Sequence, residues 1–310
     1  MGTIPTLEIE TDSCSPRIVT VTLDELLAHN FPPREMLLDP FITSQSLNLI
    51  HAWRGTGKTH VALGIAHALA SGGRFLRWTA SKPTPVLYLD GEMPGNVLQE
   101  RLAAIMNAAG SKALDGYLRL VTPDLQPDGI MPNLATTEGC NAIEAALGDA
   151  QVIFVDNISC LVRDSRKEND AESWTDVATW ALRQRARGRS ITFIHHSGKN
   201  GTQRGTSKRE DILDTVIALR RPADYMESEG ARFEVRFEKC RNLHGKNVDP
   251  FEAKLDTDQH GKQCWTTRDC KDALHDRITE LHGLGLKASE VAQELGCGRA
   301  TVYRHLKGAL

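Results

Sequence analysis

Residues 52–59 read AWRGTGKT, and they stand between an apolar run, Leu47–Ala52, and a helix-periodic segment, Thr59–Ala70. A glycine-rich loop that joins a strand to a helix and ends in Lys-Thr is typical of a phosphate-binding loop. Its glycines let the backbone curl so that N–H groups face phosphate oxygens, and the helix N-terminus adds positive potential. Ala52 stands where such loops usually have their first glycine. The loop predicts a site for ATP.

The residues from Arg54 to His60 are the candidate nucleotide ligands. In this pattern the lysine reaches the β- and γ-phosphates, and the hydroxyl that follows it binds Mg²⁺. We therefore expect Lys58 to be essential for catalysis and Thr59 to be a metal ligand. The full set of candidates is Arg54, Gly55, Thr56, Gly57, Lys58, Thr59 and His60.

Two further apolar runs end in carboxylates. Val152–Asp156 puts Asp156 at the tip of a buried strand, where an acid can support the Mg²⁺ shell. Val86–Asp90 is followed by Gly-Glu-Met, so Asp90 and Glu92 share a second tip. We expect Glu92, just past the strand, to act as the base for the attacking water, and Asp90 to cap or orient. Solvent-exposed carboxylates at strand ends are the alternative.

A third run, Ile191–His195, ends in two histidines, His195 and His196. A polar side chain at such a tip can touch the γ-phosphate and transmit its loss to the following loop. His196 is therefore a candidate catalytic residue. A purely structural histidine pair is the alternative, and a metal site is disfavoured because no further ligand stands at suitable spacing.

The alternation of short apolar runs with helix-periodic segments predicts an α/β fold with a mostly parallel twisted sheet. The expected strands are Leu47–Ala52, Val86–Asp90, Leu118–Val121, Val152–Asp156, Ile191–His195, Val216–Leu219 and Phe233–Phe237. The expected helices are Leu23–His29, capped by Thr22, then Thr59–Ala70, Val97–Ala109, Glu138–Leu147 and Trp174–Arg187. Phe233–Phe237 alternates apolar and charged residues, as an edge or antiparallel strand does.

These motifs together resemble the RecA/DnaB superfamily of ring ATPases, and most closely the plasmid-encoded RepA-like hexameric helicases, over about Pro32 to Leu255. The pieces that carry the resemblance are PPRE at 32–35, GTGKT at 55–59, LDGEM at 89–93, FVDN at 154–157, HHSGK at 195–199, RGTS at 204–207 and KCRN at 239–242. The resemblance implies a RecA-like P-loop core, Glu92 as the catalytic base, and His195 and His196 at the sensor position. It also implies that Arg241 completes the site of a neighbouring subunit, with Arg204 as a competing candidate.

Two regions could contact DNA. Residues 197–210, SGKNGTQRGTSKRE, carry Lys199, Arg204, Lys208 and Arg209 among small polar residues, so they could grip phosphates. The C-terminal stretch resembles a resolvase-like helix-turn-helix, with helices at 276–286, 289–295 and 299–307. Arg299, Tyr303 and Arg304 would then lie on an exposed face of the third helix; a protein-docking unit is the alternative reading of these helices.

The expected boundaries are an N-terminal arm at 1–30, the ATPase domain at 31–256, a linker at 257–270 and the helix-turn-helix at 271–310. The chain has 310 residues and a net charge of −3, which excludes an overall basic coat for nucleic acid. Seven scattered cysteines without a C-x-x-C pair favour a reducing cytoplasm. No apolar run has the length of a membrane span, and the N-terminus has no signal pattern.

The sequence thus predicts a DNA-dependent ATPase that uses ATP and Mg²⁺. The expected partners are single-stranded DNA, further copies of the chain in a homo-oligomeric ring (a hexamer by resemblance), and as candidates a replication initiator or primase. Two alternatives stay open. One is a RecA-type recombination or repair ATPase, and the other is a nucleotide-switched regulator that binds DNA through the helix-turn-helix.

Overall fold

The computed structural model describes residues 18–163, 170–197, 210–241 and 243–307. It divides the chain into two compact units, 1–33 and 34–310. In the first, helix α1 (Leu23–Ala28) begins at the predicted cap: the Thr22 hydroxyl accepts from the backbone N–H of Glu25, and the Glu25 carboxylate accepts from that of Thr22. This capping box fixes the start of the helix.

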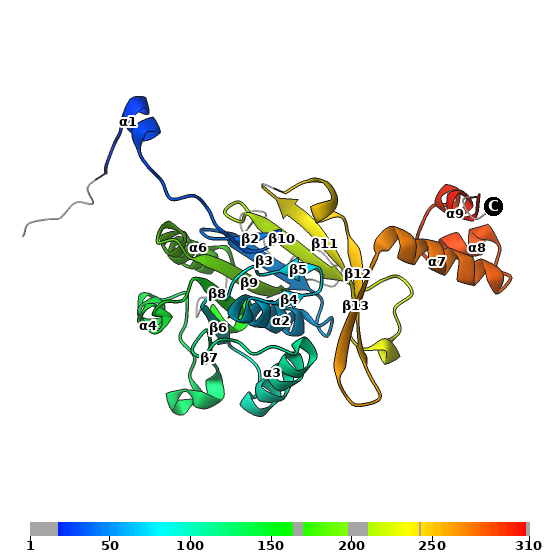
Figure 1. Cartoon of the computed structure of the whole chain (residues 1–310), viewed down its shortest axis with the longest axis horizontal. Coiled ribbons are helices and arrows are strands. Elements are labelled where there is room, and N and C mark those ends of the chain that lie inside the picture. Colours follow the sequence, from blue (N-terminus) through cyan, green and yellow to red (C-terminus); the bar gives the residue numbers. More distant parts are fainter. Residues whose placement is uncertain (1–17, 164–169, 198–209, 242, 308–310) are drawn as a thin grey trace, which may run out of the picture. The chain divides into compact units, whose positions relative to one another are not determined.

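The second unit is built on one nine-stranded sheet (Figure 1). In spatial order its strands are β13 (Gln263–Asp269), β12 (Phe251–Thr257), β11 (Arg232–Cys240), β10 (Thr215–Arg220), β3 (Leu47–Ala52), β9 (Ser190–His196), β8 (Val152–Asp156), β6 (Val86–Asp90) and β7 (Leu118–Val121). From β10 to β7 all neighbours are parallel, whereas β11, β12 and β13 are antiparallel. The predicted α/β fold with a mostly parallel sheet is confirmed.

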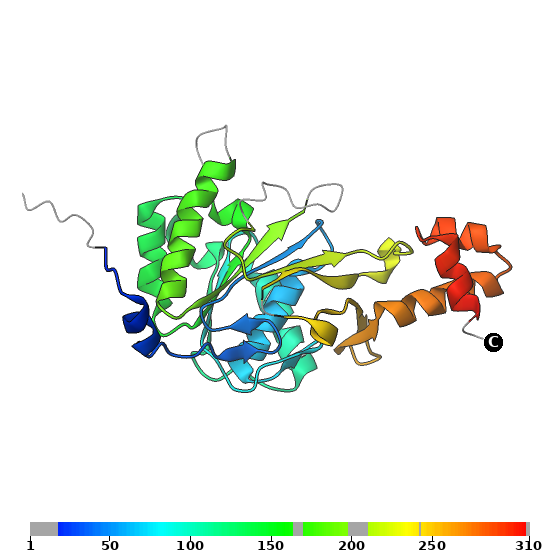
Figure 2. The ribbon, with the colours of Figure 1, turned by 90° about the horizontal axis from the view of Figure 1, so that it is seen from above.

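Helices cover both faces of the parallel strands, and Figure 2 shows the two layers on either side of the sheet. On one face α2 (Lys58–Ser71) and α3 (Gly95–Ala109) contribute to one apolar core, and on the other α4 (Thr137–Leu147) and α6 (Asp170–Ala186) contribute to a second. Almost every residue of α2 is buried, which accords with its largely apolar sequence. The short elements are α5 (Ile158–Leu161), β1 (Met36–Leu38), β2 (Ile42–Thr43), β4 (Arg74–Phe75) and β5 (Trp78–Thr79).

The segment predicted as a linker, 257–270, belongs instead to the sheet. Within it β13 pairs with β12 from Phe251↔Asp269 to Thr257↔Gln263. Its sequence, QCWTTRD, looks polar because β13 is an edge strand with one wet face. Trp265 turns to the core, 5.7 Å from the ring of Phe75. The same hairpin puts β11 inside the sheet, so the antiparallel prediction for Phe233–Phe237 is confirmed and the edge position is wrong.

Three helices follow β13: α7 (Cys270–Gly283), α8 (Ala288–Glu294) and α9 (Arg299–Lys307). They enclose a small core of their own, formed by Ile278, Val291, Ala292, Leu295 and Val302. None of the helices in the described part of the chain is long and apolar enough to span a bilayer.

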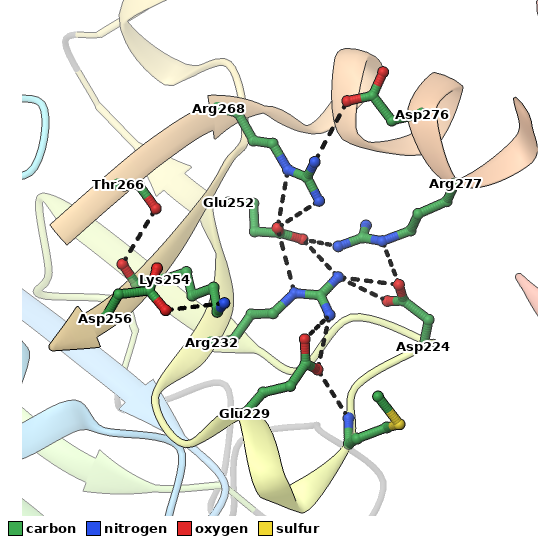
Figure 3. A network of polar contacts seen from close by, with 11 residues as sticks. Asp224, Glu229, Arg232, Glu252, Lys254, Asp256, Thr266, Arg268, Asp276 and Arg277 are labelled. Atoms are coloured by element: carbon green, nitrogen blue, oxygen red, sulfur yellow. Dashed lines mark hydrogen bonds and ion pairs between the residues drawn. The ribbon is translucent and has the colours of Figure 1, made fainter. Parts of the chain in front are cut away.

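A buried ion-pair network joins α7 to the sheet (Figure 3). Glu252 of β12 accepts from Arg232 of β11, Arg268 of β13 and Arg277 of α7. Arg232 and Arg277 also pair with Asp224. The side chain of Glu252 is 4% exposed, and the three guanidinium groups provide its ion-pair partners.

Candidate active site

The glycine-rich loop leaves the carboxyl end of β3 and opens α2 as predicted. Gly55 and Gly57 have φ of +74° and +108°, in the left-handed region that favours glycine. Gly57 is the N-terminal cap of α2, and no side chain caps its first turn. The free N–H groups of this turn are available to an anion.

The register of the sheet brings the predicted residues together at the carboxyl ends of four neighbouring strands. Asp90 pairs with Asp156 across β6 and β8, and Ala52 pairs with His196 across β3 and β9. All four strands are parallel, so their carboxyl ends meet beside the glycine-rich loop.

A cavity of about 1110 Å³ opens at this edge. Of the predicted site residues, those that line it are Arg54, Gly55, Gly57, Lys58, Thr59, Glu92, Asp156, His195 and His196. Asp90 and Asn157 also line it.

Thr56 and His60 are not in the cavity wall. Thr56 is 2% exposed, so its side chain is buried. His60 points the other way, with its ring 5.6 Å from that of Trp265 in β13. Burial is the main reason that the pKa of His60 falls to about 4. Only the backbone of these two residues could face a nucleotide.

Lys58, Thr59 and Asp156 form the polar floor of the cavity. Lys58 is 6% exposed, and burial lowers its pKa while the carboxylates of Asp156 and Glu92 counter part of that effect. Burial raises the pKa of Asp156, opposed by hydrogen bonds from Tyr88 and Thr59. A hydroxyl and a carboxylate in contact are oxygen donors of the kind that Mg²⁺ prefers, so these residues fit the ion.

Tyr88 is a site residue that the sequence analysis missed. Its hydroxyl donates to Oδ2 of Asp156 at 2.7 Å, and both residues are buried. In the sequence it is one apolar position of the run VLYLD, and nothing there indicates a polar partner.

Glu92, Asn157 and His196 form a second cluster above this floor. The Asn157 amide donates to Oε2 of Glu92 at 2.6 Å, and lies 3.4 Å from Nε2 of His196. That nitrogen is 3.8 Å from the Glu92 carboxylate. Burial lowers the pKa of His196, which favours a neutral ring. Asn157 directly follows Asp156 in the sequence, so its position at the end of a predicted strand could have identified it as a site residue.

Asp90 orients the turn that carries Glu92. Its carboxylate accepts from the backbone N–H of Glu92 at 3.3 Å and of Met93 at 3.2 Å, which confirms the predicted capping role. Burial raises its pKa to about 6.

Arg101 of α3 also lines the cavity and was not predicted. Val97 lies one helical turn before it and lines the same wall. Residues four apart lie on the same face of a helix, and Val97 follows the Glu92 turn closely. This spacing could have identified Arg101 from the sequence.

Arg241 lies beside the amino end of β3, whereas the glycine-rich loop leaves the carboxyl end of the same strand. Cys240 pairs with Thr215 of β10, which in turn pairs with Asn48 near the start of β3. From Asn48 to the end of β3 is roughly 13 Å along the strand, and the loop lies beyond that. The guanidinium of Arg241 donates to the carbonyl of Asp211. Arg241 therefore does not reach the cavity of its own chain.

The DNA-binding candidates fall in two places. Lys199, Arg204, Lys208 and Arg209 lie outside the described residues. In α9, Arg299, Tyr303 and Arg304 are exposed, with Tyr303 at 54%. The buried Val302 beside them turns to the three-helix core.

Comparison with known proteins gives a consistent result. A family model described as an AAA domain matches residues 12–202. Among solved structures, the KaiC-like protein PH0186 from Pyrococcus horikoshii OT3 superposes with a TM-score of 0.52 at 15% identity, over 74% of this chain and 93% of that one. At this identity the likeness establishes a shared RecA-like fold.

Proposed function

The chain belongs to the AAA domain family, and from this premise we infer that it is a ring ATPase that couples ATP hydrolysis to movement along single-stranded DNA. The family and the RecA-like fold indicate nucleotide hydrolysis at a P-loop. The observation that carries the proposal is the cavity at the carboxyl edge, where Lys58, Thr59, Asp156 and Glu92 converge.

In the proposed reaction Lys58 and the loop N–H groups hold the β- and γ-phosphates. Mg²⁺, when bound by Thr59 and supported by Asp156, would neutralise phosphate charge. Glu92 takes the proton of the attacking water, and the Asn157 amide fixes the carboxylate that does so. His196 would respond to the γ-phosphate, and its position 3.8 Å from Glu92 supports this role.

Arg241 supports a shared site between subunits. It lies a strand length from its own loop, so any role in phosphoryl transfer requires the nucleotide of another copy. An arginine supplied in this way contributes on the order of 10³-fold or more to hydrolysis. A closed ring lets every subunit both receive and supply this residue.

Two features support DNA as the partner. The basic segment 198–209 follows His195 and His196 closely in the sequence, so its position suits a segment that responds to hydrolysis. Arg299 and Arg304 add exposed positive charge on α9. A replication initiator or primase is a further candidate partner.

The test measures ATP hydrolysis and strand displacement on a forked duplex, with and without single-stranded DNA. We expect DNA-stimulated hydrolysis, unwinding that requires ATP, and loss of both in Lys58→Ala. Unwinding that persists in Lys58→Ala contradicts the proposal. Stable filaments on DNA without unwinding favour the recombination ATPase. Sequence-specific duplex binding that Arg304→Ala abolishes, without unwinding, favours the regulator.

A further inference from the structure

A chain of hydrogen bonds leads from the end of β9, which carries the sensor candidates His195 and His196 and is called the sensor strand below, to β11, the strand directly before Arg241. His51 Nδ1 lies 2.8 Å from the Ser197 hydroxyl, directly after His196. His51 Nε2 lies 2.8 Å from Oε2 of Glu238. Glu238 also accepts from Arg220 at 2.5 Å. We name Ser197, His51 and Glu238 the His51 relay.

The relay crosses the sheet because a small residue lets it pass. His51 pairs with Ala218 of β10, which separates β3 from β11. The side chain of Ala218 is short enough for the imidazole and the carboxylate to meet over it. The register between β10 and β11 shifts between Val216 and Ile217, so Glu238 is an extra residue on β11. Such a bulge re-aims the side chain it carries.

Each member of the relay depends on the others. The His51 side chain is 1% exposed and Ser197 is 5% exposed, whereas the Glu238 side chain at the end of the relay is 29% exposed. The hydrogen bond from His51, followed by that from Arg220, lowers the pKa of Glu238 against its burial. A buried polar group that loses its partner destabilises the protein. A displacement of one member of the relay therefore favours a displacement of the next, which keeps the hydrogen bond.

The two ends of the relay reach functional elements. Ser197 is fixed to β3 by a hydrogen bond from its backbone N–H to the Ala52 carbonyl, next to the glycine-rich loop. Beyond Glu238, Lys239 and Arg241 donate to the carbonyls of Glu210 and Asp211. Ser197 and Glu210 flank the basic segment 198–209.

We propose that His51 is a positioning residue that couples the sensor strand to the strand of Arg241. A change of the nucleotide beside His196 then shifts the position of Arg241, the arginine that would enter the site of the adjacent subunit. The inference rests on the proposed ring ATPase and adds a route by which one site influences the next. The coupling is a physical contact between two packed elements, as transmission between sites requires.

The experiment compares four full-length variants: His51→Leu, Ser197→Ala, their double variant, and the control Asn48→Ala. Asn48 is a buried polar residue of the same strand, and its hydrogen bonds go to Ser46, Ser190 and the Ile191 carbonyl, away from β11. ATP affinity, turnover, the Hill coefficient for ATP and thermal unfolding are measured for each.

We expect His51→Leu, whose side chain lies outside the cavity, to keep ATP affinity, and both His51→Leu and Ser197→Ala to lower turnover by about 2- to 30-fold and to bring the Hill coefficient to about 1. The double variant loses no more than the stronger single one, because both break one chain of contacts. Asn48→Ala loses stability and keeps cooperativity. If His51→Leu does not fold, Glu238→Ala decides in its place, because Glu238 contacts His51 and lies outside the cavity that Ser197 lines.

A wild-type Hill coefficient that the relay variants leave unchanged, or additive losses in the double variant, overturns the role of His51. A wild-type protein that hydrolyses ATP without cooperativity, as a monomer, overturns the ring ATPase itself. The two failures are therefore distinguishable.

Discussion

The hydrogen bond between Tyr88 and Asp156 gives a prediction whose magnitude follows from the structure. Tyr88→Phe removes a donor that lies 2.7 Å from a buried carboxylate, while the ring keeps its stacking on Phe154, 5.5 Å away. No core volume is lost beyond one oxygen. A hydrogen bond to a charged group contributes about 1.5–3 kcal/mol, so we expect unfolding in urea to require about 2 kcal/mol less free energy.

The same change acts on catalysis. The Tyr88 hydroxyl favours the ionised form of Asp156, so its removal raises the pKa of that carboxyl further. The acidic limb of the ATPase pH profile should then move to higher pH, because Asp156 must be ionised to support Mg²⁺.

The control for this prediction is Tyr225→Phe. The Tyr225 hydroxyl donates to the Gly230 carbonyl at 2.8 Å on the exposed surface, where water can replace it. We expect a change below about 0.5 kcal/mol. If Tyr88→Phe costs no more than this control and leaves the pH profile unmoved, the reasoning about the buried carboxylate is refuted.

Two further predictions concern stability, both measured by urea unfolding. The pKa of His60 is about 4 in the fold and 6.5 outside it, so the unfolded chain binds the proton first and stability falls as pH drops from 6.5 to 4, by up to about 3 kcal/mol. His60→Gln should remove that part of the slope and His260→Gln, an exposed control, should not; equal slopes in all three proteins would refute the assignment. Gly64→Ala places a Cβ 2.2 Å from the Phe75 ring and should cost about 1–3 kcal/mol, whereas Gly283→Ala, at the last residue of α7, meets open space and should change the stability by less than about 0.5 kcal/mol. The reverse order would contradict the packing described.

Strands that are buried on both faces could be predicted from the sequence. Leu47–Ala52, Val86–Asp90 and Val152–Asp156 have the same bounds in the structure, because their apolar runs stop where the sheet meets the site. Parallel pairing then required their terminal side chains to meet. The nucleotide cavity was predictable for that reason.

Contacts set by register could not be predicted in this way. The His51 relay depends on a bulge in β11. It also depends on Ala218 of β10, which lies between His51 of β3 and Glu238 of β11, two strands that are not neighbours in the sheet. β13 was missed because an edge strand with one wet face resembles a polar linker. The partners of the relay are distant in the chain, whereas β13 pairs with the strand directly before it, and only the contact of Trp265 with Phe75 joins it to a distant segment.

The central claim, that the site is completed by Arg241 of another copy, is tested most directly by mixing two inactive variants. Lys58→Ala keeps Arg241 but lacks a working loop, and Arg241→Ala keeps the loop but lacks the arginine. In a random mixed ring about a quarter of the interfaces pair an intact loop with an intact arginine. The account predicts that mixing restores ATP hydrolysis to about that fraction of wild type. Mixed rings that stay inactive, or an Arg241→Ala protein that hydrolyses ATP at the wild-type rate, would contradict it.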